Sequence, residues 1–409
     1  MKVYGIMTSE ISIMNKRGVA LAADSAVTVG GSKIFNSVNK IFTLSSSHYI
    51  GIMIYGNASL GRIPWEVLIK NFRENLGNEV SNDFDTYVEL FLEYINDAPY
   101  VKDSRQDYHL IRNYLDQVTE RIEFIINQNY GYIDNAQEFN GKLAVTINEL
   151  HAESGKTLGL DKQQFDDAYA PEIQERLVST FEYLKYPISE DVKLKFSDMI
   201  FKLIDDINFI GSSFSGVVLA GYGANEPFPK MAELKIDGFI FNKLKYLIDS
   251  SVTISDDPDD GSMSYSLNTF AQSDVTMSFI NGIDTEYLEF IQNRNRELRD
   301  SIVNNLPEHS EEISRKFDEN KKVVDNFMKE NYRIPFGSMI EFLTIPEMSE
   351  MAETFINLTS FKRHYSDSVE TVGGEVDALV ISRSEGPIWT KRKRYFDRVD
   401  NIGYEKRRM

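Results

Sequence analysis

Three polar residues near the start of the chain, Thr8, Asp24 and Lys40, are the candidates for chemistry. Asp24 closes the apolar run Leu21–Ala23, and Lys40 opens the apolar pair Ile41-Phe42. Both charges therefore fall at the ends of predicted buried strands, where an unpaired charge is costly. A lysine held between an aspartate and a hydroxyl can have a perturbed pKa and prepare that hydroxyl for attack on a carbonyl. The alternative is an ordinary ion pair, because sixteen residues between Asp24 and Lys40 do not by themselves show that they meet.

Other kinds of site have less support in the sequence. The chain has no cysteine, which excludes disulfides, thiolate metal sites and a cysteine nucleophile. Asp256–Gly261 lacks the ligand spacing of an EF-hand loop and is interpreted as a hairpin turn, while Gly221-Tyr222-Gly223 fails the dinucleotide pattern at its third glycine. The histidines have no paired metal-ligand spacing and are interpreted as surface or structural residues: His48, His109, His151, His309 and His364. We therefore expect neither a metal nor a cofactor.

Composition and charge limit the class of protein. Of the 409 residues, 42 % are apolar and 12 % are aromatic, which is enough for a packed core. The net charge of −19 argues against nucleic-acid binding, which usually needs a basic face. The one basic cluster, Lys391–Arg394 with Lys406–Arg408, is either a solvated strand end and tail or a docking tail for an acidic partner. With no signal peptide and no long apolar run, we expect a cytoplasmic protein without a membrane partner.

The first part of the chain is predicted to form strands followed by a helix. Asn15–Gly18 is a turn signal, and Val19–Ala23 is typical of a short buried strand. Two more strands are predicted at Lys40–Leu44 and Tyr49–Tyr55. Helical spacing of apolar residues then predicts a helix that ends at about Leu76. These strands would carry all three candidate residues.

The rest of the chain alternates between helical and strand patterns. Residues 77–211 are predicted to be a mainly helical insertion, and helices are predicted again at Asp284–Asn331 and Met348–Phe361. The later predicted strands are Gly216–Gly221, Ala232–Phe241, a ribbon pair over Lys245–Phe270, Val376–Ser382 and Ile388–Lys393. This order suits layered sheets with helices outside them.

The run Gly18–Thr28 resembles the signature of proteasome β-subunits and their bacterial relatives. In that family the catalytic threonine is followed by an aspartate after sixteen residues and by a lysine after sixteen more. Thr8, Asp24 and Lys40 have these separations, and Ile11 and Ile13 stand at the family's inward positions of the first strand. The resemblance implies that the three residues are the catalytic set of an N-terminal-nucleophile (Ntn) hydrolase.

Further motifs extend the resemblance to about half of the chain. Tyr55–Ala58 is similar to the turn whose glycine, here Gly56, helps to form the oxyanion hole. Val218–Gly238 is similar to the central hairpin of the fold, and Val372–Ile381 to the Gly-Gly loop before the penultimate strand. The implied fold class is α+β, a four-layer αββα Ntn-hydrolase sandwich with a large, mainly helical insertion. Its expected segments are core 8–76, insertion 77–211, core 212–283, helical segment 284–345, and core with basic tail 346–409.

Several positions depart from the family pattern. Met7 replaces the glycine that usually precedes the threonine and eases autocatalytic cleavage, and Ala26 replaces the usual arginine. The serine expected after the eighth strand has only a loose counterpart at Gln272-Ser273. Thr8 and Ser9 are adjacent hydroxyl residues, and the spacing favours Thr8 as the nucleophile.

The loop before the Gly-Gly pair also departs. Val372 replaces the serine that supports the threonine amine, and Val369 replaces an upstream aspartate. Asp367 or Glu370 could substitute for that aspartate. These changes favour the alternative that the chain is a non-catalytic, proteasome-like ring scaffold or partner-binding subunit.

The resemblance implies amide hydrolysis, most directly of peptides or proteins. Met1–Met7 would be removed, so that the α-amine of Thr8 could act as base for its own hydroxyl. Lys40 would lower the proton affinity of the hydroxyl, Asp24 would orient Lys40, and an acyl-Thr8 ester would be hydrolysed by water. The family also implies a homo-oligomer, with an ATP-dependent unfoldase as a candidate partner.

Overall fold

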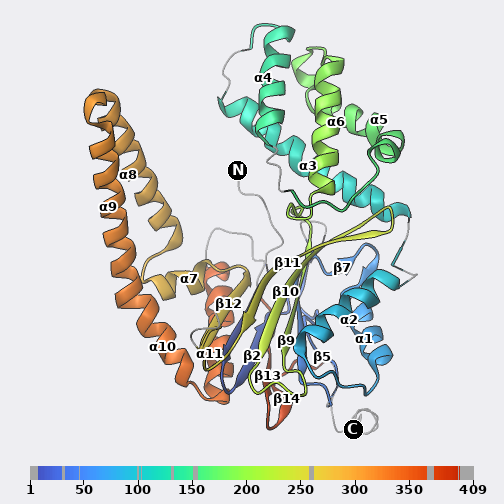
Figure 1. The fold of residues 1–409 in the computed structure, drawn as a ribbon, viewed down its shortest axis with the longest axis vertical. Helices are drawn as coiled ribbons and strands as arrows, with labels where there is room; N and C mark the ends of the chain where they lie inside the picture. Colours follow the sequence, from blue (N-terminus) through green and yellow to red (C-terminus); the bar gives the residue numbers. More distant parts are fainter. Residues whose placement is uncertain are drawn as a thin grey trace.

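Two five-stranded antiparallel sheets form the centre of the molecule (Figure 1). This computed structural model describes residues 8–29, 33–45, 47–98, 101–102, 104–129, 133–150, 155–257, 262–365, 373–394 and 396. The first sheet has the order β12 (Tyr265–Ala271), β1 (Ser9–Asn15), β2 (Gly18–Ala23), β13 (Asp377–Ser382) and β14 (Gly386–Lys391). The second has the order β11 (Lys243–Thr253), β10 (Lys230–Ile240), β9 (Ser215–Gly221), β6 (Ile50–Gly56) and β5 (Ile41–Thr43). The chain is thus a mixed α/β protein whose sheets are antiparallel.

Two small hairpins accompany these sheets. β3 (Val27–Val29) pairs with β4 (Lys33–Phe35), and β7 (Ser59–Leu60) pairs with β8 (Ile63–Pro64). The second hairpin lies between Gly56 and the first helix, in a stretch where no strand was predicted.

The two large sheets pack face to face through apolar side chains. Met14 and Leu21 of the first sheet share one buried cluster with Met53 and Val218 of the second. Side chains alternate across a strand, so Glu10 and Ser12 lie on the same face of β1 as Met14. The inner face of β1 therefore carries polar residues at its start and an apolar residue near its end.

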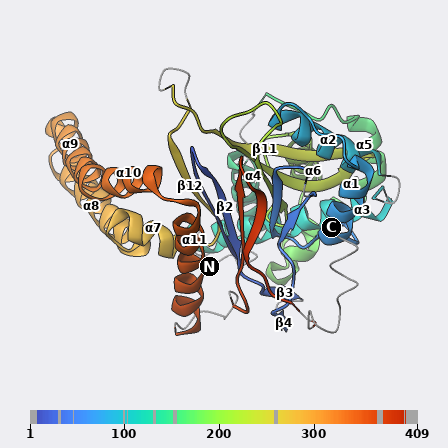
Figure 2. The same cartoon turned by 90° about the horizontal axis from the view of Figure 1, so that it is seen from below.

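Helices cover the outer face of each sheet (Figure 2). α1 (Trp65–Leu76) and α2 (Phe84–Asp97) bury their apolar faces against the second sheet. α10 (Ile334–Phe342) and α11 (Ile345–His364) cover the first sheet, where they contact Ile11 and Ile13. The two isoleucines are therefore buried, but they point toward the helices and not toward the other sheet.

Four helices of the predicted insertion form a lobe with its own core. α3 (Ser104–Asn129), α4 (Ala136–Glu149), α5 (Lys162–Thr180) and α6 (Glu190–Asp205) share one apolar cluster, which Ile240 joins from the end of β10. Lys245 secures the junction by donating hydrogen bonds from Nζ to the carbonyls of Leu203, Ile204 and Asp206. Residues 77–211 are mainly helical among those described, as predicted, but α2 packs beside α1 on the sheet and lies outside the lobe.

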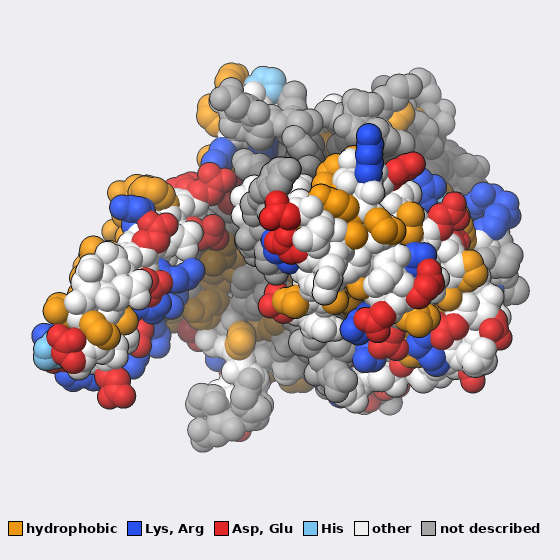
Figure 3. Space-filling model, turned by 90° about the horizontal axis from the view of Figure 1, so that it is seen from above, with side chains coloured by type: hydrophobic (Ala, Val, Ile, Leu, Met, Phe, Trp, Pro, Cys, Tyr) orange, Lys and Arg blue, Asp and Glu red, His pale blue; other side chains and the backbone are white. Residues whose placement is uncertain are grey.

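A helical hairpin, α8 (Thr285–Asn305) and α9 (Ser310–Met328), projects from the first sheet as an arm (Figure 1). α7 (Asp274–Asn281) leads into it, and a π-helical turn, Lys329–Arg333, connects it to α10. Among its described residues, α8 buries none and α9 buries only Met328. Figure 3 shows hydrophobic, acidic and basic side chains mixed on the surface of this arm.

One strand pairing differs from the prediction. Lys245–Phe270 does not form a ribbon pair, because β11 pairs with β10 in one sheet and β12 pairs with β1 in the other. Among the described residues, a bridge between Ile254 and Met263 and a hydrogen bond from Ser262 Oγ to Asp257 O join the two segments. The chain crosses here from one sheet to the other, and part of the predicted turn, 258–261, lies outside the described residues. In the part of the chain that the structure describes, no helix is long and apolar enough to cross a membrane.

Candidate functional site

The structure brings Asp24 and Lys40 into direct contact. Asp24 follows β2 and Lys40 precedes β5, and Lys40 Nζ lies 2.5 Å from Asp24 Oδ1. Thr8 precedes β1. Thr8, Asp24 and Lys40 are all buried, with an exposed fraction of at most 3 % each. The predicted contact between Asp24 and Lys40 is confirmed, and neither charge is buried alone.

Asp24 is a fixed anion that connects three segments. Its Oδ1 accepts from Ser9 N at 3.1 Å, and its Oδ2 accepts from Ala26 N and Gly373 N, each at 3.1 Å. With Lys40, each oxygen of Asp24 therefore has two donors. A carboxylate held in this way has its orientation set by the backbone, so it can position Lys40.

A second buried carboxylate, Glu10, joins the site and was missed in the sequence. Thr8 Oγ1 donates to Glu10 Oε2 at 3.0 Å, and Lys40 Nζ lies 3.1 Å from Glu10 Oε1. Glu10 thus stands between the hydroxyl and the ammonium, which were expected to face each other directly. The signal was available, because strand alternation places residue 10 on the same face as residues 8, 12 and 14.

Burial and charge act against each other on these groups. Burial raises the pKa of Glu10 from 4.5 to about 7, with Lys40 opposing this rise and Asp24 adding to it. Burial alone would lower the pKa of Lys40, but the attraction of Glu10 and Asp24 outweighs it and raises that pKa. Lys40 therefore stays protonated at neutral pH, while Glu10 exchanges its proton near neutrality.

Thr8, Lys40 and Gly56 line one small pocket between the sheets. The other lining residues are Val27, Val38, Ile54, Tyr55, Asn57 and Ala58. Gly56 has φ +74°, and a Cβ there would lie 2.7 Å from Phe214 O. Only glycine fits this conformation and spacing without strain. Three of the four predicted site residues, Thr8, Lys40 and Gly56, thus line one pocket. The fourth, Asp24, holds Lys40 in place through a direct hydrogen bond.

Tyr55 adds a neutral polar group to the pocket wall. Its hydroxyl donates to Glu233, whose Oε2 accepts from Ser250 Oγ at 3.0 Å. Burial, as the larger cause, and the negative charge of Glu233, as the smaller one, raise the pKa of Tyr55 well above its usual range. Tyr55 therefore remains protonated and serves as a fixed donor to Glu233.

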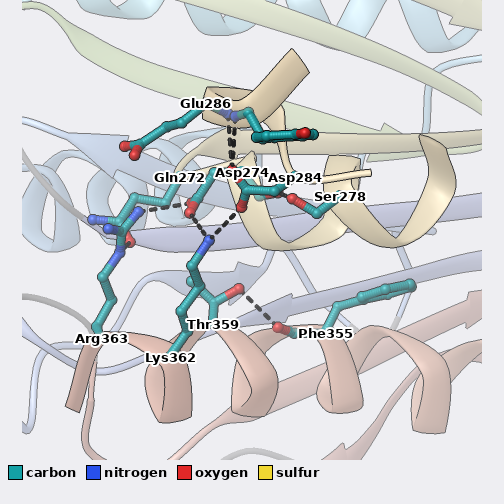
Figure 4. Close-up of polar contacts among 10 residues, drawn as sticks. Gln272, Asp274, Ser278, Asp284, Glu286, Phe355, Thr359, Lys362 and Arg363 are labelled. Carbon is teal, nitrogen blue, oxygen red and sulfur yellow. Dashed lines mark hydrogen bonds and ion pairs between the residues drawn. The ribbon is translucent and has the colours of Figure 1, made fainter. Parts of the chain in front are cut away.

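The end of β12 links the Thr8 segment to the base of the arm. Gln272 N donates to Thr8 O at 3.1 Å, and Arg363 of α11 donates from Nε to Gln272 Oε1 at 2.9 Å. Arg363 and Lys362 also bind Asp274 at the start of α7 (Figure 4). The sequence pointed to the pair Gln272-Ser273. In the hydrogen bonds of the described residues, Gln272 is the member of this pair that contacts Thr8.

Several residues singled out in the sequence lie outside the described residues. These are Met7, His151, Asp367, Val369, Glu370 and Val372, together with positions 1–6 and the tail 406–408. At the described end of the basic cluster, Lys393 pairs with buried Asp377 at 2.5 Å.

The described histidines and acidic residues do not form a metal centre. His48 is buried and hydrogen-bonds to Ser45 and to the carbonyl of Glu79, which is a structural role. In the described ranges, no group of three or more histidines and carboxylates is placed to hold a metal ion.

Comparison with known proteins returned no relatives in sequence. No family model matches the chain, and no curated protein matches it. Functional inference therefore depends on the geometry of the pocket and on the spacing of its residues.

Proposed function

We propose that the chain is a threonine-nucleophile hydrolase that cleaves amide bonds, most directly those of peptides, on a four-layer αββα sandwich of the Ntn type. The observation that carries this proposal is the convergence of Thr8, Lys40 and Gly56 on one pocket, with Lys40 held by Asp24. A hydroxyl, a fixed cation and a glycine turn are the parts that acyl transfer needs.

Each residue has a distinct role in the proposed reaction. Thr8 Oγ1 attacks the amide carbonyl carbon, and the charge that develops on the carbonyl oxygen is stabilised at the backbone of Gly56. Lys40 stabilises negative charge on the attacking oxygen and is kept in place by Asp24. Loss of the amine leaves an acyl-Thr8 ester, which water then hydrolyses. No cofactor takes part.

Substitution of the nucleophile tests the proposal. Thr8→Ala should reduce hydrolysis of a fluorogenic peptide panel to background, while Ser9→Ala, which removes the adjacent buried hydroxyl, should keep most of the activity. Thr8→Ala also removes the donor to the buried Glu10 carboxylate, so the free energy of unfolding should fall by about 1 to 3 kcal/mol, which thermal unfolding can check. Equal activity of Thr8→Ala and wild type would show that the nucleophile has been misassigned.

A non-catalytic scaffold is the second candidate function. It is favoured by the closed arrangement of Glu10, Asp24 and Lys40, in which the one buried ammonium contacts both carboxylates as in a structural ion cluster. A wild-type protein that is inert toward the whole peptide panel, yet forms a stable oligomer, would support this second function.

A further inference from the structure

We propose that Glu10 is the general base for Thr8, so that the hydroxyl can be activated while Met1–Met7 is still attached. This inference depends on the proposed hydrolase function and changes its mechanism. The expectation from the sequence was that the α-amine of Thr8 would take the proton, which requires removal of the preceding segment. A peptide nitrogen cannot do this, because its lone pair is delocalised into the carbonyl.

Among the described residues, the geometry places one acceptor against the Thr8 hydroxyl. Thr8 Oγ1 donates to Glu10 Oε2 at 3.0 Å, within the reach required of a general base. Both residues are buried, at 2 % and 1 % exposure, so bulk water does not compete for this hydrogen bond. The contact is formed within one strand start and does not depend on a free chain end.

The other charged groups of the site are unsuited to this role. Lys40 is held between two carboxylates, which keep its ammonium protonated and leave it no lone pair. Each oxygen of Asp24 already has two donors, from Lys40 and from the backbone of Ser9, Ala26 and Gly373. Glu10 is the carboxylate that touches the hydroxyl, and Lys40 lies beside its other oxygen.

The groups that face Glu10 also set the pH at which it can act. Asp24 follows β2, Lys40 precedes β5, and Tyr55 on β6 is a neutral phenol bound to Glu233. Burial and Asp24 raise the pKa of Glu10, and Lys40 limits the rise, which leaves it at about 7. A base with this pKa is ionised just above neutral pH and still binds a proton strongly.

In the proposed reaction, Glu10 accepts and returns each proton that Thr8, the leaving nitrogen and water exchange. As Thr8 Oγ1 bonds to the carbonyl carbon, its proton moves to Glu10 Oε2 and the carbonyl π electrons move to oxygen. Collapse of this intermediate breaks the C–N bond, and Glu10 returns the proton to the leaving nitrogen. Water then attacks the ester, giving its proton to Glu10, and Thr8 Oγ1 recovers that proton when the acid leaves.

The test measures the pH dependence of peptide hydrolysis by the full chain, together with the state of its N-terminal segment. Activity of the wild type should rise through about pH 7, because Glu10 must be ionised to act as base. Glu10→Gln should lower kcat/KM by about 10²- to 10⁴-fold and remove this rise, and Glu10→Asp should restore part of both. Trypsin digestion of the active protein should release Val3–Lys16 as one peptide that contains both Met7 and Thr8.

Asp237→Asn is the matched control, because Asp237 is also a carboxyl whose pKa burial raises, but it binds Tyr114 at the helical lobe. This variant should keep the wild-type pH profile. Activity that appears only in chains starting at Thr8, with Glu10→Gln as active as wild type, would overturn the role of Glu10 and leave the hydrolase proposal standing. A wild type that is inert in every form would overturn both.

Discussion

At the residue scale, the site is a balance of three buried charges around one hydroxyl. Glu10 and Asp24 share Lys40, so the cluster carries one negative charge in excess when all three are ionised. Placing that excess charge in the interior is unfavourable, and protonation of Glu10 relieves it. The same residue that could accept the proton of Thr8 therefore also links the stability of the protein to pH.

This linkage predicts the direction of a stability change. The pKa of Glu10 is raised from 4.5 to about 7 in the folded protein, so the folded state holds an extra proton between these values. The free energy of unfolding should therefore fall as pH rises through this window, by up to about 3 kcal/mol. Glu10→Gln cannot ionise and should escape this loss.

Denaturant unfolding of wild type and Glu10→Gln at about pH 5 and about pH 8 measures the effect. The difference between the two proteins should shift in favour of the variant at the higher pH. A difference that does not change with pH would mean that Glu10 is not the titrating group.

At the scale of elements, short-range patterns in the sequence predicted much of what positions the site. The strands that carry Asp24 and Lys40 and the helix that ends at Leu76 were located from local apolar spacing, and the structure confirms them. The contact between Asp24 and Lys40 came from the resemblance in spacing and not from the patterns alone. The role of Glu10 was missed because it depends on which side of β1 faces the other sheet.

Long-range pairing was harder to predict. The sequence between Lys245 and Phe270 has the pattern of two strands, but nothing local shows that β11 and β12 belong to different sheets. α10 lies within the helical segment expected at 284–345 but beyond the helix predicted over Asp284–Asn331, because Pro335 and Gly337 are poor helix formers; the helix is held by burial of Ile340 against the first sheet. Tertiary packing, and not local sequence, therefore determines both the strand pairing of β11 and β12 and the formation of α10.

The α8–α9 arm gives a prediction at this scale. Two paired helices with almost no buried residues have only marginal stability in water. The arm also exposes large apolar side chains, since Phe290 and Phe327 are each 57 % exposed. Acidic and basic residues are mixed on its surface (Figure 3) and pair within each helix, as Arg294 does with Glu297 and Arg315 with Glu319. We propose that the arm forms the contact of a homo-oligomer.

Light scattering after size-exclusion chromatography tests the arm. Wild type should exceed the mass of one 46.9 kDa chain, and the double variant Phe290→Glu/Phe327→Glu should elute as a monomer. Leu194→Glu, which changes a similarly exposed apolar residue on α6, should keep the wild-type mass. A wild type that is monomeric at micromolar concentration would contradict an oligomer built on this arm.

At the scale of the whole molecule, the lobe and the arm extend from the two central sheets (Figure 1). The pocket is lined by residues at strand ends of both sheets, including Thr8 before β1 and Gly56 at the end of β6. Gln272 links the Thr8 segment through Arg363 to the start of α7, and α7 leads into the arm. The lobe is joined through the ends of β10 and β11, where Ile240 and Lys245 lie. The central sheets thus hold the proposed chemistry, and the two helical parts extend away from it.

The most direct test of the central claim is to trap the acyl-enzyme and locate it. A β-lactone opened by a hydroxyl leaves a stable ester, and mass spectrometry of the tryptic peptides can assign it to one residue. We expect one adduct per chain on Thr8, retained in Ser9→Ala and absent from Thr8→Ala. No adduct on the wild type, or the same adduct on Thr8→Ala, would contradict a threonine nucleophile at this pocket.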